Sequence, residues 1–278
     1  MLKKAAFYLF ARPFVAGETI YAAIEKAVDL NKKKIYPVIN ILGEHVKDQK
    51  EARAYFDQYL ELIIKSAMAL ANVNVAVKPS QLGAEIDKKY FQTLLGGLLS
   101  AVKFYLPLSL VEVDAEDYEY SSAVKDVCLE LAKTYPDNLR VCRQINRKET
   151  PKEILQLIEA GVSVRLCKGT VYKGDIQDEK ELRNIFIEQA ILLSKRGNRP
   201  AIATHDLYLI HMLCDVENFE FQVLLGIENK EMFKMAAAGK KVGFYLPCGP
   251  NWCAYGKRRW KSIIKIFWRN WKYKTEGG

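Results

Sequence analysis

Short runs rich in β-branched and aromatic residues recur along the whole chain of 278 residues. These runs have the length and composition of buried strands, and they lie at residues 34–42, 73–78, 109–115, 139–144, 162–169, 201–206, 219–225 and 241–247. Segments with helical spacing of apolar residues lie between them, such as 51–70 and 179–196. Strands that alternate with helices predict a parallel sheet covered by helices. A set of eight favours closure into a (β/α)8 barrel of the TIM type over an open sheet.

The chain is expected to form a single α/β domain over residues 1–278. No linker or low-complexity tract divides it, and only the basic, aromatic segment 257–278 departs in composition. Half of the residues are hydrophobic, which is enough for a substantial core. No run approaches 18 apolar residues, and the N-terminal apolar stretch is too short for a signal peptide. We therefore expect a soluble, cytoplasmic protein.

Several common chemistries have no support in the sequence. It contains no GxGxxG, GxxxxGK[ST] or GxSxG motif. The three histidines form no HxH or HxxxH pair and the six cysteines no CxxC, so we expect reduced thiols and no metal site. The formal net charge of +9 permits an anionic partner. No recognisable nucleic-acid-binding module is present, so we expect no nucleic acid.

Charged or hydrogen-bonding residues follow nearly every predicted strand. Active sites of (β/α)8 barrels lie at the C-terminal ends of the strands, so these residues predict one polar mouth. They are Gly43, Glu44, Lys78, Ser80, Asp114, Gln144, Arg165, Lys168, Gly169, Thr204, His205, Gln222, Tyr245 and Gly249.

The pattern leaves other interpretations of four of these residues open. Lys78 could be an exposed strand end, and Asp114 could be the N-cap of a helix. His205 could satisfy a backbone carbonyl in its βα turn. A lysine at a strand end could also be the Schiff-base nucleophile of a barrel aldolase, which makes Lys78 and Lys168 candidates for that chemistry.

A second informative segment follows the last predicted strand. If it is helical, Tyr255 lies within about one turn of both Arg258 and Arg259. Two adjacent guanidinium groups can clamp a carboxylate or a phosphate. The alternative is a basic helix on the surface.

Taken in order, these motifs resemble those of the monofunctional bacterial proline dehydrogenases. The matching segments are RPFVAGETI, NILGEHVKD, VAVKPSQLG, VEVDAED, VRLCKG, AIATHD, FEFQVLLGI, and YLPCG followed by YGKRRW. The resemblance covers nearly the whole chain and implies a distorted (β/α)8 barrel that binds FAD at the strand ends. It implies oxidation of L-proline to Δ1-pyrroline-5-carboxylate, the first step of proline catabolism to glutamate. A hydride would pass from C5 to flavin N5, and the electrons to a quinone.

The resemblance also implies a role for individual residues. The FAD contacts that it implies are Ala115, Gln144, Arg165, Lys168, Gly169, Thr170, Thr204 and His205. The L-proline contacts that it implies are Lys78, Tyr245, Tyr255, Arg258 and Arg259. Asp114 and Arg165 are the implied catalytic residues, with Arg165 near flavin N5. Arg165 and Lys168 are expected to face the flavin and its phosphates, near the Arg258–Arg259 pair.

Four positions bear on how closely the family pattern is followed. Thr170 and Val171 stand where the family commonly reads KGAY, and Ser262 replaces an acidic residue. Tyr245 favours proline over hydroxyproline, since relatives that take hydroxyproline have a smaller residue there.

The C-terminal tail has two interpretations. Its apolar residues fall on one helical face and comprise Trp260, Ile263, Ile264, Phe267, Trp268 and Trp271. This face could pack on the barrel as its eighth helix. It could also rest on the inner face of an anionic membrane as a peripheral contact. A separate pyrroline-5-carboxylate dehydrogenase is the expected partner that receives the product.

Overall fold

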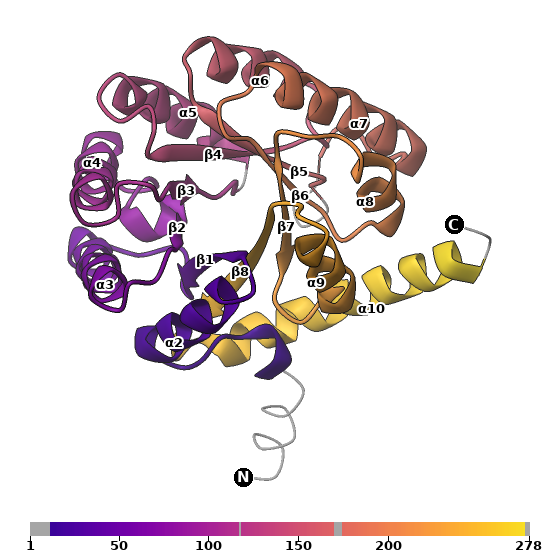
Figure 1. The fold of residues 1–278 in the computed structure, drawn as a ribbon. Helices are drawn as coiled ribbons and strands as arrows, with labels where there is room; N and C mark the ends of the chain where they lie inside the picture. The colour runs from indigo at the N-terminus through magenta and orange to yellow at the C-terminus, as the bar shows by residue number, and fades with distance from the viewer. Residues whose placement is uncertain (1–11, 117, 170–173, 276–278) are drawn as a thin grey trace.

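A computed structural model describes residues 12–116, 118–169 and 174–275, and it forms a closed parallel barrel (Figure 1). The strands follow one another around the barrel in sequence order. They are β1 (Ile35–Ile41), β2 (Asn74–Val77), β3 (Val111–Val113), β4 (Leu139–Gln144), β5 (Ser163–Cys167), β6 (Ala201–Ala203), β7 (Glu220–Leu224) and β8 (Val242–Cys248). The barrel closes where β1 pairs with β8, from Ile35 opposite Val242 to Ile41 opposite Cys248. Each predicted strand is present, and the predicted (β/α)8 fold is confirmed.

Helices connect the strands and surround the barrel (Figure 1). They are α2 (Ile20–Asn31), α3 (Gln49–Met68), α4 (Lys88–Tyr105), α5 (Tyr118–Ala132), α6 (Thr150–Glu159), α7 (Glu179–Arg196), α8 (Leu207–Leu213), α9 (Asn229–Ala237) and α10 (Trp252–Thr275). Two short 3-10 turns, η1 (Arg12–Phe14) and η2 (Pro79–Leu82), complete the described elements. Aspartates start several helices by accepting a hydrogen bond from a backbone N–H of the first turn, as Asp48 does for α3 and Asp178 for α7.

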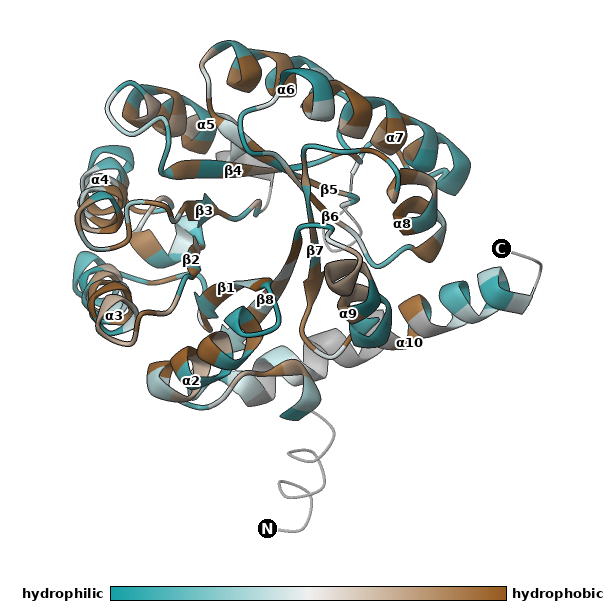
Figure 2. Cartoon of the chain, viewed as in Figure 1, coloured by the Kyte–Doolittle hydropathy of each residue, from teal (hydrophilic) through white to brown (hydrophobic). Residues whose placement is uncertain are grey.

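Side chains of the strands alternate between the helices and the interior of the barrel. Val111 and Val113 of β3 belong to the hydrophobic core, which the apolar faces of the surrounding helices complete (Figure 2). Glu112, between them, contacts Arg165 of β5, which is not a neighbouring strand. The contact therefore crosses the interior of the barrel. Alternation thus places apolar residues outside the barrel wall and polar residues within it.

The C-terminal helix α10 contacts the barrel through buried side chains that include Asn270, and it extends beyond the ring of helices (Figure 1). Asn270 donates to the carbonyl oxygen of His205 at 2.8 Å and accepts from the amide of Leu207 at 3.4 Å. The outer face of α10 exposes Ile264, Trp268 and Trp271. None of the described helices is long and apolar enough to cross a bilayer.

Candidate active site

Arg165 lies in the centre of the polar residues that the sequence predicted at the mouth of the barrel. Its side chain is buried, and its guanidinium donates from Nη1 to Glu112 Oε2 at 2.9 Å and from Nη2 to Asp114 Oδ1. The guanidinium carbon also lies 5.6 Å from the centre of the Tyr245 ring. The buried charge that the sequence carries through β5 is therefore compensated by two carboxylates. One donor, Nε, is buried and has no hydrogen-bond partner among the described residues.

Asp114 joins Arg165 to Tyr245. Its second oxygen accepts a hydrogen bond from the Tyr245 hydroxyl at 2.5 Å. Burial, followed by the charge of Asp114, raises the pKa of Tyr245 well above its ordinary value. The hydroxyl therefore stays protonated and can hold the carboxylate in place. The next helix, α5, begins only at Tyr118, so Asp114 is not the residue directly before it, and the N-cap alternative is wrong.

Lys78 forms an ion pair with Glu44 at the neighbouring strand end. The ammonium lies 2.6 Å from Glu44 Oε2, and both side chains are about one-fifth exposed. Lys78 is thus a partly buried cation at the mouth and not an exposed strand end. Tyr255 is buried near the start of α10. Arg258 and Arg259 lie in the same helix, but their side chains, like that of Ser262, fall outside the described part of the structure.

Lys168 has partners that the sequence interpretation did not include. Its buried ammonium donates to Asp206 Oδ2 at 2.6 Å and to Glu179 Oε1. Arg183 holds the same aspartate with two hydrogen bonds, of 2.9 and 3.0 Å. Lys168 thus pairs with α7 and the start of α8, whereas Arg165 contacts Glu112 and Asp114 inside the barrel. The two cations therefore have different partners. The contact of Lys168 with a cofactor remains a prediction.

Asp206 is ionised and pairs with both cations, Lys168 and Arg183. Burial acts to raise its pKa, but the hydrogen bonds from Arg183 and the charge of Lys168 outweigh burial and lower the pKa to about 2. Asp206 also caps α8 by accepting from the amide of Tyr208 at 3.2 Å.

The remaining predicted cofactor residues lie along the ends of β3 to β6. Gln144 is buried at the end of β4, and its Oε1 has no hydrogen-bond partner among the described residues. Thr204 accepts a hydrogen bond from the amide of Asp206. His205 Nε2 accepts from the amide of Leu224, at the end of the neighbouring strand β7, at 3.4 Å, so this bond is not to a carbonyl in its own turn. Thr170 falls outside the described residues.

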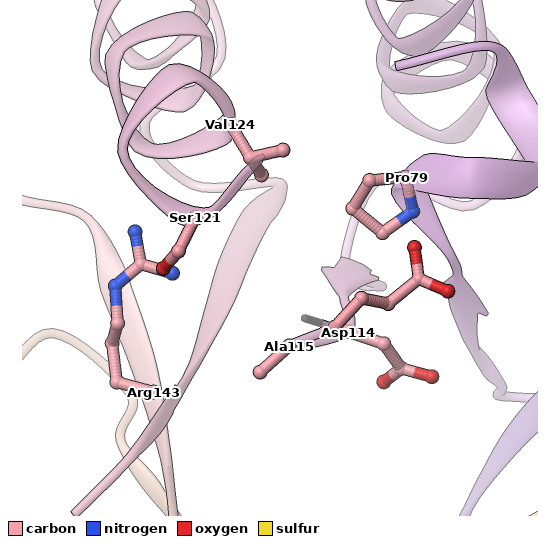
Figure 3. Close-up of a pocket in the computed structure, with 7 residues that line it drawn as sticks. Pro79, Asp114, Ala115, Ser121, Val124 and Arg143 are labelled. Atoms are coloured by element: carbon pink, nitrogen blue, oxygen red, sulfur yellow. The ribbon is translucent and has the colours of Figure 1, made fainter. Parts of the chain in front are cut away.

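A small cleft opens beside Asp114 and Ala115 (Figure 3). It encloses about 230 Å³, solvent at its opening included, and lies between η2 and the first turns of α5. Its lining residues are Pro79, Asp114, Ala115, Glu116, Ser121, Val124 and Arg143. The space in it that a water-sized sphere can occupy is only about 10 Å³, room for about one water molecule, so this cleft by itself is too small for a dinucleotide.

Unsatisfied buried polar atoms are uncommon in folded proteins and often indicate a ligand. Arg165 Nε and Gln144 Oε1, which have no partner within the described part of the chain, come from the neighbouring strands β5 and β4, near the mouth. A donor and an acceptor of this kind fit the polar edge of a flavin ring. Residues of this chain could therefore hold such a cofactor.

Gly169 follows β5 where the backbone must turn. Its φ is +80°, and a Cβ there would lie 2.3 Å from Asn146 Oδ1 and 3.0 Å from Gln144 Cβ. A side chain at this position would therefore displace Gln144 or Asn146, both of which belong to the mouth. Only glycine suits both the conformation and the close approach.

Replacing Gly169 by alanine is expected to lower the free energy of unfolding by about 2–3 kcal/mol, because the left-handed backbone costs about 1 kcal/mol and the overlap adds to it. Gly161→Ala is the matched control, since Gly161 has a φ of +72° and a Cβ added there would have nothing within 4 Å. That control should lose only about 1 kcal/mol. Urea denaturation of both variants measures the difference, and equal losses would contradict the steric argument.

Sequence reasoning missed the acidic partners of these cations. Glu112, Asp206 and Glu179 were not among the predicted site residues, although each bonds Arg165 or Lys168. One signal was available for Glu112, because an acidic residue between two valines of a buried strand must face a polar interior.

The fold and the site together define a (β/α)8-barrel enzyme with its charged residues at the C-terminal ends of the strands. No family model matches the chain. Over 264 residues it is 27% identical to "Proline dehydrogenase 1" of Bacillus subtilis, covering 90% of this chain and 86% of that protein. It is 26% identical to a proline dehydrogenase of Deinococcus radiodurans, covering 93% of this chain and 87% of the relative. The predicted resemblance is confirmed, since the chain is similar over nine-tenths of its length to proteins named proline dehydrogenase.

Solved structures show the same fold. Proline utilization A (PutA) from Bdellovibrio bacteriovorus, inactivated by N-propargylglycine, matches with a TM-score of 0.80 at 21% identity, over 93% of this chain. PutA from Corynebacterium freiburgense matches with a TM-score of 0.77 at 17% identity, over 95% of this chain. The chain spans about a third of the length of these two proteins, 33% and 32% respectively.

Proposed function

We propose that the chain oxidises L-proline to Δ1-pyrroline-5-carboxylate, with FAD accepting a hydride from proline C5 at flavin N5 and a quinone taking up the electrons. The observation that carries this proposal is the match to proteins named proline dehydrogenase over nine-tenths of the chain. The buried Arg165 Nε and Gln144 Oε1, unpartnered among the described residues, support it, because they offer hydrogen bonds to a polar ring at the mouth of the barrel.

The chain's own residues would bind and orient the substrate. Lys78, Arg258 and Arg259 are the cations proposed to hold the proline carboxylate. Tyr245 and Tyr255 would wall the ring, with Tyr245 fixed by its 2.5 Å hydrogen bond to Asp114. Holding the reacting carbon in one orientation can lower a barrier by several kcal/mol. FAD supplies the hydride acceptor when it is bound.

The remaining proposed cofactor contacts are Ala115, Lys168, Gly169, Thr170, Thr204 and His205. Ala115 lines the cleft beside Asp114, and Thr204 and His205 lie in the turn that Asn270 attaches to α10. The position of Thr204 and His205 between β6 and α8 supports a role in cofactor binding, since barrel sites use these loops.

The structure does not favour the alternative function of a Schiff-base aldolase. Its nucleophile must be a neutral amine, whereas Lys78 and Lys168 each form an ion pair with a carboxylate.

The proposed function is tested by the absorbance of the purified protein after incubation with FAD. We expect a yellow protein whose flavin band bleaches without oxygen when L-proline is added. Trans-4-hydroxy-L-proline should bleach it more slowly, because Tyr245 leaves little room beside the ring. A protein that takes up no FAD, or a bound flavin that L-proline leaves oxidised, would rule out this function.

A peripheral membrane contact would bring the site near a lipid-soluble quinone. The outer face of α10 supports it, since Trp268 and Trp271 are about half exposed and the helix contains no acidic residue. A separate dehydrogenase would then receive the product from the aqueous side.

A further inference from the structure

Glu112 is the centre of a hydrogen-bond network in the interior of the barrel. Its side chain is fully buried, with 0% exposure. Its Oε1 accepts from Asn74 at 2.8 Å, Arg140 at 2.7 Å and Gln222 at 3.0 Å, while Oε2 accepts from Arg165 at 2.9 Å. Burial acts to raise the pKa of Glu112, but Arg140 and Arg165 outweigh burial and lower it. Glu112 is therefore ionised.

This network fixes the orientation of Arg165. Glu112 occupies Nη1 and Asp114 occupies Nη2, so both ends of the planar guanidinium are held. Only Nε is left without a partner among the described residues, in the place where the proposed flavin would bind. Without Glu112 the guanidinium could rotate about its hydrogen bond to Asp114, and the Nε–H bond would no longer point in a fixed direction.

Glu112 also makes the electrostatic potential less positive for a ligand beside Arg165. A lone guanidinium would stabilise the negative charge that a flavin gains on reduction. Here two carboxylates contact Arg165, so most of its positive field is cancelled. Arg165 then acts mainly as an oriented hydrogen-bond donor.

We infer that Glu112 is a positioning residue that aims Arg165 Nε at the flavin and, by balancing the charge of Arg165, keeps the reduction potential of the bound flavin low. This inference rests on the proposed function, since it requires FAD beside Arg165.

The test is the reduction potential of FAD bound to the full-length protein, measured by dithionite titration against a reference dye. Glu112→Gln keeps the size and an acceptor oxygen but removes the charge. We expect it to shift the equilibrium at least tenfold toward the reduced flavin, about 30 mV for a two-electron couple. Glu112→Asp keeps the charge and should restore most of the wild-type value.

Glu220→Gln is the matched control. Glu220 is buried in the same network and contacts Arg140 and Gln222, with no bond to Arg165 among the described contacts. The carboxylate of Glu220 faces Arg140 and not Arg165, so its replacement by glutamine leaves both carboxylates that contact Arg165 in place. We expect the potential of this variant to stay within twofold of the wild-type equilibrium.

A second variant covers the case in which Glu112→Gln does not fold. Glu112→Gln combined with Arg140→Leu and Glu220→Gln removes the charges of Arg140 and of both its carboxylate partners, so no buried carboxylate is left beside a missing cation. Arg165 still loses its partner, so the potential should again rise.

The outcomes separate this inference from the proposed function. A bound flavin that L-proline does not reduce ends the proposed function, but the dithionite comparison still supports the inference if Glu112→Gln raises the potential. An unchanged potential in Glu112→Gln, or an equal rise in Glu220→Gln, overturns the inference even when L-proline reduces the flavin. A protein that binds no FAD overturns both.

Discussion

Replacing Arg165 by methionine is expected to lower kcat/KM for L-proline by roughly 10²–10³-fold, the usual loss when one aligned donor is removed from a buried reaction site. The same change leaves Glu112 and Asp114 without their shared cation. Removing one member of a buried ion pair costs about 3–5 kcal/mol. Steady-state kinetics with a dye acceptor measures the first effect, and urea denaturation followed by circular dichroism measures the second.

Arg165→Lys separates charge from geometry. Lysine keeps one positive charge, but it has no Nε donor and cannot bond two carboxylates with a rigid fork. We expect a smaller loss of stability than in Arg165→Met and nearly the same loss of kcat/KM. If Arg165→Met stays within fivefold of the wild-type kcat/KM, Arg165 has no role in the reaction.

Replacing Asp206 by asparagine is expected to lower the free energy of unfolding by about 3 kcal/mol at pH 7. Asparagine can still cap α8, so the loss reports mainly the charge. It leaves Lys168 buried beside Arg183 with only the half-exposed Glu179 as an acidic partner among the described residues. Glu179→Gln is the control, and it should cost less, about 1 kcal/mol, because Glu179 is half exposed and the buried Lys168 keeps Asp206 as its partner. Equal losses of unfolding free energy in the two variants would contradict the expectation that the buried Asp206 contributes more than the half-exposed Glu179.

The stability of the wild-type protein should also depend on Asp206 in acid. The pKa of Asp206 is about 2 in the folded protein against an ordinary value of 3.8. Because the folded value is the lower one, the contribution is complete above pH 4 and is lost as the pH falls from about 4 to about 2. The shift corresponds to about 2 kcal/mol. Asp206→Asn should lose that part of the pH dependence in urea denaturation between pH 2 and 5, and an unchanged profile would contradict it.

Two features of the site could have been read more closely from the sequence. Arg165 and Lys168 are three positions apart, and in an extended chain an odd spacing points side chains to opposite faces. The structure accordingly gives Arg165 partners inside the barrel and Lys168 partners on α7 and α8. Glu112 between two core valines carried the same kind of signal.

The partners themselves could not be predicted in this way. Arg165 bonds Glu112 and Asp114, which lie 53 and 51 positions away, and Lys168 bonds Asp206, 38 positions away. Propensity and periodicity describe neighbours within a few residues. Pairs at this separation meet only because the barrel closes.

By itself the sequence determined the eight strands, their alternation with helices, and the polar residues at the strand ends, because strand and helix periods are local properties of the chain. It also carried the motifs that resemble proline dehydrogenases. Only the tertiary structure decided which carboxylate balances which cation, and that one donor of Arg165 is left without a partner among the described residues. Closure brings distant strands together in a dry interior, where each buried charge must find an opposite one.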